Sequence, residues 1–235
     1  MAKNRLLRIL SAIAIGLFIL CIPIFLLTTN LAWAVNSVRL YEYGFNKYDV
    51  REATGIEDEE LLVAAREMIH YFNWGKEPIQ ITISAPDGEE LFSEREVAHL
   101  RDVKGLIGLC YHLKEATFGY LVAFAIGGFI WQRRRFAPFS NLLAKMMVGG
   151  SILTIALLIV VGIVALVSFD WLFLNFHRLF FSGDSWILSG YLPQMFPPGF
   201  FYDAALFIVG AIIVEALVIG GMGGFVVLRR VRSRG

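Results

Sequence analysis

Histidines are the residues of this chain best suited to chemistry near neutral pH, because an imidazole gains or loses its proton between about pH 5 and 8. The sequence contains four of them, His70, His99, His112 and His177. His70 lies in a charged helical segment and His112 at the entry to an apolar run, where polar surface residues are common. His99 and His177 are therefore the candidates for a catalytic role.

The surroundings of these two candidates suggest different kinds of support. Asp102 follows His99 by three residues and so shares its helix face, where its carboxylate can hold the imidazole in one tautomer. His177 lies among phenylalanines, where an unpaired polar ring is costly. For each histidine an ordinary structural role stays open beside the catalytic one. The pattern indicates general acid–base catalysis, although two histidines and one carboxylate can also bind zinc with an open position.

Two further kinds of residue invite a chemical role. Glu215 falls inside the last apolar run, and an ionisable group at such a depth is a functional hypothesis by default. A structural hydrogen bond and a role in lipid or proton handling are equally open for it. Cys21 and Cys110 are too few for a disulfide framework and are expected to be packing residues. Leu20 is too bulky for the lipoprotein signal that Cys21 would otherwise suggest.

Several motifs are missing from the sequence. It has no G-x-S-x-G elbow, no H-E-x-x-H pair and no glycine-rich phosphate loop. The residues therefore give no sign of an enzyme nucleophile or a resident cofactor, and apart from the zinc alternative above no metal is expected. No basic and aromatic surface suggests a nucleic-acid partner.

Composition points to lipid as the solvent of most of the chain. Of its 235 residues 57% are hydrophobic and 17% are charged, whereas about a quarter of the residues are charged in a soluble domain. Four apolar runs approach or exceed the roughly 20 residues that cross a bilayer: about Leu7–Leu27, Thr117–Trp131, Leu142–Val167 and Phe200–Leu228. Ala32-Trp33-Ala34 resembles a signal-peptide cleavage site, but the first run is longer than the usual h-region of about 7–15 residues. We therefore predict a polytopic α-helical membrane protein with four transmembrane helices.

Clusters of Lys and Arg predict the orientation of these helices, because cytoplasmic flanks carry an excess of both. The clusters are Lys3, Arg5 and Arg8; Arg133, Arg134, Arg135 and Lys145; and Arg229, Arg230, Arg232 and Arg234. Four spans place all three on one side, so both termini are expected in the cytoplasm. The expected division is residues 1–29, first helix; 30–114, extracytoplasmic domain; 115–168, second and third helices with a basic loop; 169–199, outer loop; 200–228, fourth helix; and 229–235, basic tail.

The longer outer segment has the pattern of a small α+β domain. Asp58 is expected to begin a helix that ends near Phe72 and has an apolar stripe at helical spacing. Isoleucines alternate with polar residues over 79–83, as in a half-buried strand. Pro86-Asp87-Gly88 favours a turn, after which Glu90-Leu91-Phe92 can return as a second strand. Ser93 and Glu96 form a capping box that opens a helix to about Leu106.

The shorter outer segment is dominated by aromatic residues from Phe169 to Trp186. Such residues favour the headgroup zone of a membrane, where an amphipathic segment can lie flat. We predict an interfacial or re-entrant piece that rests its aromatic face in membrane lipid.

These motifs resemble a known family. Residues 91–104, LFSEREVAHLRDVK, resemble the E-x-x-H-(M/L)-x-D-V-K signature of the lipoprotein intramolecular transacylase (Lit) family, through Glu96, His99 and Asp102. A second block resembles its aromatic motif: Phe173, Phe176-His177, Leu179-Phe180-Phe181, Trp186, Phe196-Pro197 and Phe200-Phe201-x-Asp203-Ala204. The likeness extends over nearly the whole chain.

The resemblance implies a specific reaction. Such enzymes move the sn-2 acyl chain of a diacylglyceryl-modified lipoprotein to the α-amine of its own N-terminal cysteine. Two histidines catalyse the transfer, and the motif matches are His99 and His177, with Asp102 orienting His99. Phe176, Phe180, Phe181 and Trp186 would then hold the substrate's acyl chains, with the site at the outer leaflet of the cell membrane. A non-catalytic protein that binds lipids or lipoproteins, and a metal-dependent membrane hydrolase, remain as alternatives.

Overall fold

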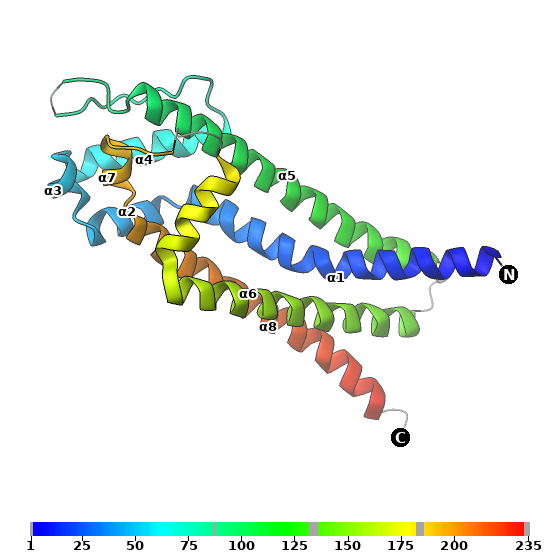
Figure 1. The fold of residues 1–235 in the computed structure, drawn as a ribbon. Coiled ribbons are helices and arrows are strands. Elements are labelled where there is room, and N and C mark those ends of the chain that lie inside the picture. Colours follow the sequence, from blue (N-terminus) through cyan, green and yellow to red (C-terminus); the bar gives the residue numbers. More distant parts are fainter. Residues whose placement is uncertain (1, 87, 132–135, 182–185, 233–235) are drawn as a thin grey trace. The chain divides into compact units, whose positions relative to one another are not determined.

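The computed structural model describes residues 2–86, 88–131, 136–181 and 186–232. This part of the chain is almost entirely helical (Figure 1). The helices are α1 (Ala2–Asn36), α2 (Val38–Lys47), α3 (Val50–Thr54), α4 (Asp58–Asn73), α5 (Glu94–Trp131), α6 (Phe136–Phe180), α7 (Tyr191–Met195) and α8 (Pro198–Arg232). Asp87, Arg133 to Arg135, residues 182–185 and Arg234, which the sequence predictions used, lie outside the described residues.

Four of the helices, α1, α5, α6 and α8, are long and apolar enough to cross a membrane. This confirms the predicted polytopic α-helical class. The helices form two compact units, the first made of residues 1–30, 111–163 and 209–235 and the second of residues 31–110 and 164–208. Each of the four long helices contributes residues to both units. Cys21 and Cys110 are both free, as expected.

The first unit is held together by small residues where helices meet. A Cβ on Gly150 of α6 would collide with the Ile22 side chain of α1, and a Cβ on Gly223 of α8 would lie 2.6 Å from the Ala144 carbonyl oxygen. Helices in lipid associate largely through such close backbone approach, because the apolar solvent offers no hydrophobic drive. The sequence predicts that Gly220, Gly221, Gly223 and Gly224 in α8 permit close helix packing, and Gly220 and Gly223 do so. A Cβ on Gly221 or Gly224 would meet only open space among the described residues, so the expectation was wrong for these two.

Glu215 of α8 has a partner inside this unit. The side-chain amide of Asn30 in α1 donates to Glu215 Oε2 at 2.8 Å and also to the Leu26 carbonyl at 2.9 Å. Asn30 is buried. The intramembrane carboxyl group therefore accepts a hydrogen bond from another long helix, with an amide in place of a basic side chain.

The second unit has its own apolar core. Helix α4 begins at Asp58 and buries Leu61, Ala65, Met68 and Phe72 on one face, which confirms the predicted helix and stripe. Helix α2 contacts α3 and α4, and helix α3 contacts α7. Rings from α2 and from the end of α7 complete the core, with Tyr41 lying 5.7 Å from Phe196.

The expected strands do not form, so the α+β prediction for this domain was wrong. In the described residues, the 79–92 segment has one isolated bridge, Ser84 with Glu90, and a turn in which Gly88 N–H donates to the Ala85 carbonyl. A single short hairpin is marginal in water without a third strand or a covering surface. The backbone N–H and hydroxyl of Thr82 instead donate to the Glu67 carboxylate of α4, at 2.8 and 2.6 Å.

Two helix boundaries also differ from expectation. Helix α5 starts at the capping box but continues to Trp131, because no proline interrupts it and Gly105 and Gly108 are accommodated inside the helix. Helix α6 passes Val167 and ends at Phe180, with one non-helical residue, Ser168, at φ −159° and ψ 86°. The first part of the aromatic segment is thus a helix that follows a kink.

Candidate active site

The first turn of α5 positions one of the candidate histidines. The Glu96 carboxylate accepts hydrogen bonds from the backbone N–H and the hydroxyl of Ser93, both at 2.9 Å. The Ser93 oxygen in turn accepts from the Glu96 N–H at 3.4 Å. This is the reciprocal pattern of a capping box, and it confirms the predicted helix start. His99 follows Glu96 by one turn and is 7% exposed.

The second candidate histidine lies on α6 after the kink. His177 Nδ1 lies 2.8 Å from the Phe173 carbonyl oxygen, one turn earlier in the same helix. A carbonyl oxygen can only accept, so Nδ1 must carry the proton and donate. A neutral His177 therefore keeps its lone pair on Nε2, the nitrogen that can act as a base.

These two imidazoles lie together in the second unit. Their ring centroids are 6.0 Å apart with an interplanar angle of 23°. Phe181 contacts both rings, at 4.8 Å from His99 and 5.4 Å from His177. Two histidines that are 78 positions apart in the chain thus lie side by side. Both the acyltransferase and the metal-dependent hydrolase hypotheses require this.

The surroundings of His99 Nδ1 limit the role that Asp102 can have. Nδ1 of His99 is buried without a hydrogen-bond partner in the described chain. Asp102 is exposed on the same helix, so the direct bond that would fix the tautomer from its carboxylate is not formed at this nitrogen. A buried acceptor without a donor is tolerated better than a buried N–H without an acceptor. This favours the tautomer of His99 that carries its proton on Nε2.

The aromatic residues expected to bind substrate divide into two groups. Phe176 and Trp186 lie 5.6 and 5.5 Å from the His177 ring, and Phe181 is buried beside both histidines. Phe180 is exposed and contacts Phe176 at 4.9 Å. Phe173, whose ring is nearest to His177 at 4.3 Å, was not among the residues expected to bind substrate. Because Phe173 lies four residues before His177, its spacing could have predicted that the two rings share one helix face.

The other candidates lie elsewhere. Within the described residues, no group of three or more His, Cys, Asp or Glu side chains is placed to hold a metal ion. The hydrolase hypothesis, in which His99, His177 and Asp102 together bind a metal ion, therefore has no support in this part of the chain. His70 and His112 are both exposed, as predicted for surface residues, and the His70 ring packs against Trp74 at 5.9 Å.

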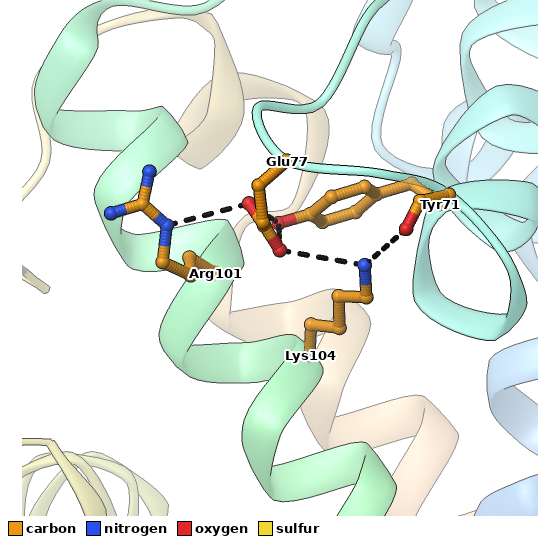
Figure 2. A network of polar contacts seen from close by, with 5 residues as sticks. Tyr71, Glu77, Arg101 and Lys104 are labelled. Atoms are coloured by element: carbon orange, nitrogen blue, oxygen red, sulfur yellow. Dashed lines mark hydrogen bonds and ion pairs between the residues drawn. The ribbon is translucent and has the colours of Figure 1, made fainter.

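A polar network ties the loop after α4 to the helix that carries His99 (Figure 2). The Glu77 carboxylate accepts the Tyr71 hydroxyl at 2.7 Å, Arg101 Nε at 3.3 Å and Lys104 Nζ at 3.4 Å. Lys104 Nζ also donates to the Gly75 carbonyl at 2.5 Å. Burial alone would raise the pKa of Glu77, but these hydrogen bonds outweigh it and hold that pKa below its ordinary value. Burial and the bond to Glu77 raise the pKa of Tyr71.

This network predicts how stability responds to acid. Because the folded-state pKa of Glu77 is lowered, its contribution is present above the unfolded value of about 4.3 and is lost as the pH falls through the folded value. The side chain is partly exposed, so we expect Glu77→Gln to destabilise by no more than about 1 kcal/mol at pH 7. The difference between wild type and variant should shrink below pH 4. Thermal unfolding of the detergent-solubilised proteins at pH 7, 5 and 3 measures it, and a difference that grows toward pH 3 contradicts the assignment.

A second polar cluster was not predicted from the sequence. Asp203, near the start of α8, is buried and accepts hydrogen bonds from Lys47 Nζ at 2.6 Å and the Tyr48 hydroxyl at 2.9 Å. The bond to Asp203 raises the pKa of Lys47. Burial, with the same carboxylate, raises the pKa of Tyr48. The cluster joins α2 to α8 and involves neither histidine.

A cavity of about 660 Å³ lies on the other face of the first turns of α5. It is lined by residues of the 78–92 segment together with Glu94, Val97, Ala98 and Arg101. At 100° per residue these α5 positions point away from Glu96 and His99. The cavity is therefore separate from the paired imidazoles.

Comparison with known proteins identifies relatives of this arrangement. The model of the family "Lipoprotein intramolecular transacylase Lit" matches residues 16–201. No curated protein matches the chain significantly. A solved structure of the membrane-integral lipoprotein intramolecular transacylase Lit from Bacillus cereus is 19% identical, with a TM-score of 0.80, and the match covers 94% of this chain and 97% of that one. A variant of that protein with one histidine replaced by alanine is 18% identical, with a TM-score of 0.77 over 97% of this chain and 98% of the other.

Proposed function

Since this chain belongs to the lipoprotein intramolecular transacylase family, it is a multi-pass membrane acyltransferase that acts on lipoproteins, and we propose the specific reaction that it performs. The sn-2 acyl chain of a diacylglyceryl-modified cysteine moves to the α-amine of the same cysteine. The product is an N-acylated lipoprotein with one acyl chain left on the glycerol. The observation that carries this proposal is the pair of imidazoles 6.0 Å apart, set among aromatic rings.

The chemistry requires a base and a hydrogen-bond donor and needs no nucleophile from the enzyme. The substrate amine attacks the ester carbonyl carbon, a C–N bond forms, and the C–O bond to glycerol breaks. The reacting groups are joined in one molecule, so holding them in contact geometry lowers the barrier substantially. An α-amine has a pKa of about 7.7–8.0, so a histidine base suits it near neutral pH.

The roles of the two histidines are assigned from their hydrogen bonds. Nε2 of His177, left free by the bond from Nδ1 to Phe173, takes the proton that the amine loses. It then returns that proton to the departing glycerol oxygen, so the proton balance closes within one turnover. Nε2–H of His99 donates to the oxygen on which negative charge develops. The sequence left open which histidine is the base. In this assignment Asp102 acts on His99 only through its charge.

The aromatic residues would bind the substrate's acyl chains. Phe176 and Trp186 contact His177, and Phe181 contacts both imidazoles. Phe180 is exposed and would face lipid. With the Lys and Arg clusters in the cytoplasm, both termini are inside and the paired histidines are at the outer leaflet.

The decisive experiment uses a defined substrate. A synthetic diacylglyceryl-cysteine lipopeptide that cannot cross the membrane is added to right-side-out vesicles that contain the protein, and the lipopeptide is read by mass spectrometry. We expect an N-acyl, monoacylglyceryl cysteine with an unchanged total number of acyl chains. Unaltered substrate supports the non-catalytic alternative, and free fatty acid supports a hydrolase.

Two controls make the result specific. Substrate with an acetylated α-amine lacks the nucleophile and should not react. A chelator should leave the rate unchanged, whereas loss of activity that returns with zinc would favour the metal-dependent hydrolase. Reaction only in inside-out vesicles would overturn the proposed orientation while leaving the chemistry intact.

A further inference from the structure

Glu96 makes a contact that its capping role does not explain. Its Oε1 accepts the backbone N–H of Leu192, 96 residues further along the chain, at 2.7 Å. Oε2 is already occupied by both Ser93 donors. Glu96 is 1% exposed, and a carboxylate that is almost fully buried is rare unless it is paired. Its three hydrogen bonds divide between the start of its own helix and a distant segment.

The opposing segment is shaped to receive this carboxylate. A Cβ built on Gly190 would lie 2.5 Å from both Glu96 carboxylate oxygens. The backbone of Gly190 has a negative φ of −93°, so the close approach of the Glu96 carboxylate, and not a left-handed φ, calls for glycine here. The adjoining residue of α5 also contacts this segment, because Arg95 donates to the Ile187 carbonyl at 3.4 Å.

The position of this contact relates it to the paired imidazoles. Glu96 and His99 are one turn apart on the same face of α5, and the segment that Glu96 binds follows Trp186, whose ring packs on His177. We propose that Glu96 is a positioning residue, which locks the first turn of α5 onto residues 190–192 through Leu192 N–H and Gly190 and so sets the distance between His99 and His177. The proposal rests on the function proposed above, in which both rings act on one ester.

Three variants separate this role from helix capping. Glu96→Gln keeps the size of the side chain but presents an amide N–H to one of the donors. Gly190→Ala places a methyl group against the Glu96 carboxylate and pushes it away from residues 190–192. Ser93→Ala is the matched control, since it removes the hydroxyl of the capping box and leaves the bond to Leu192 in place. A misplacement of about 1 Å can cost about 10²-fold in rate, so we expect Glu96→Gln and Gly190→Ala to lower kcat by about that factor with little change in KM. Ser93→Ala should change kcat by less than about threefold, because the bond that crosses to Leu192 remains.

A double-mutant test distinguishes positioning from general destabilisation. If Glu96 acts through the histidines, Glu96→Gln should lower the rate no further in a His177→Asn background, because effects within one catalytic unit are not additive. Equal fold losses in both backgrounds would overturn the proposal. Amide exchange of the peptide that contains Leu192 gives a readout independent of activity. We expect protection in wild type and Ser93→Ala and loss of protection in Gly190→Ala, whose added methyl group displaces the Glu96 carboxylate.

The outcomes of the two proposals are separable. If wild type transfers no acyl chain, the proposed function fails, whatever the exchange data show. If wild type is active and Glu96→Gln keeps its kcat, the positioning role fails alone. A Gly190→Ala protein that retains protection at Leu192 also overturns it.

Discussion

Replacing His99 or His177 by asparagine is expected to lower the rate of acyl transfer about 10²–10⁴-fold, the usual contribution of general acid–base catalysis. Asparagine approximates the size of imidazole but cannot take up a proton near neutral pH. The double variant should be no slower than the slower single variant, because the two rings act on one transition state. Initial rates with the synthetic lipopeptide, measured by mass spectrometry, test this.

The control for this prediction is His70→Asn. His70 is exposed on α4 and its ring packs only on Trp74 among the described rings, so this variant should keep the wild-type rate. Folding of each variant is checked by its unfolding temperature in detergent. A folded His99→Asn or His177→Asn protein with the wild-type rate would remove the proposed site and leave the lipoprotein-binding alternative. An equal loss of rate in His70→Asn would show that the assay reflects the expression level of the variants and not catalysis.

The second large effect concerns the carboxyl group of Glu215. Asn30→Leu removes its donor and leaves a polar group unpaired between long helices. Interhelical hydrogen bonds in membranes contribute about 0.6–2 kcal/mol, and a charged carboxylate at the centre of a span costs about 2.5–3.5 kcal/mol. We expect Asn30→Leu to destabilise the protein by about 2 kcal/mol, measured by unfolding in mixed detergent and denaturant.

A pair of further variants decides between the two roles left open for Glu215. Glu215→Gln keeps an oxygen that can accept from Asn30 but cannot exchange a proton. A structural role predicts wild-type stability and activity for this variant, whereas proton handling predicts a folded, inactive protein. The double variant Asn30→Leu with Glu215→Leu should recover most of the stability that Asn30→Leu loses, because no polar group is then left unpaired. Failure to recover would mean that Asn30 acts through the Leu26 carbonyl alone.

Some local features were predictable because a few neighbouring residues decide them. Ser93 and Glu96 predicted the start of α5, and the capping box forms as expected. The stripe that includes Leu61 and Met68 predicted the buried face of α4. The strand predicted at 79–83 does not form, because strand pairing depends on residues that are not neighbours in the sequence. Alternation shows that a segment can pair, but pairing requires a partner strand, and Glu67 of α4 takes the Thr82 N–H instead.

The sequence by itself determined four apolar runs of spanning length and, through two motifs, the family, and it singled out His99 and His177 as candidates. These follow from composition and short spacing, which do not depend on how the chain closes on itself. Only the tertiary structure decided that the His99 and His177 rings meet 6.0 Å apart and that Asn30 faces Glu215. The Glu96 to Leu192 bond likewise joins residues 96 positions apart. A hydrogen bond requires two atoms within about 3 Å, and for residues so distant in sequence only the packing of whole helices sets that separation.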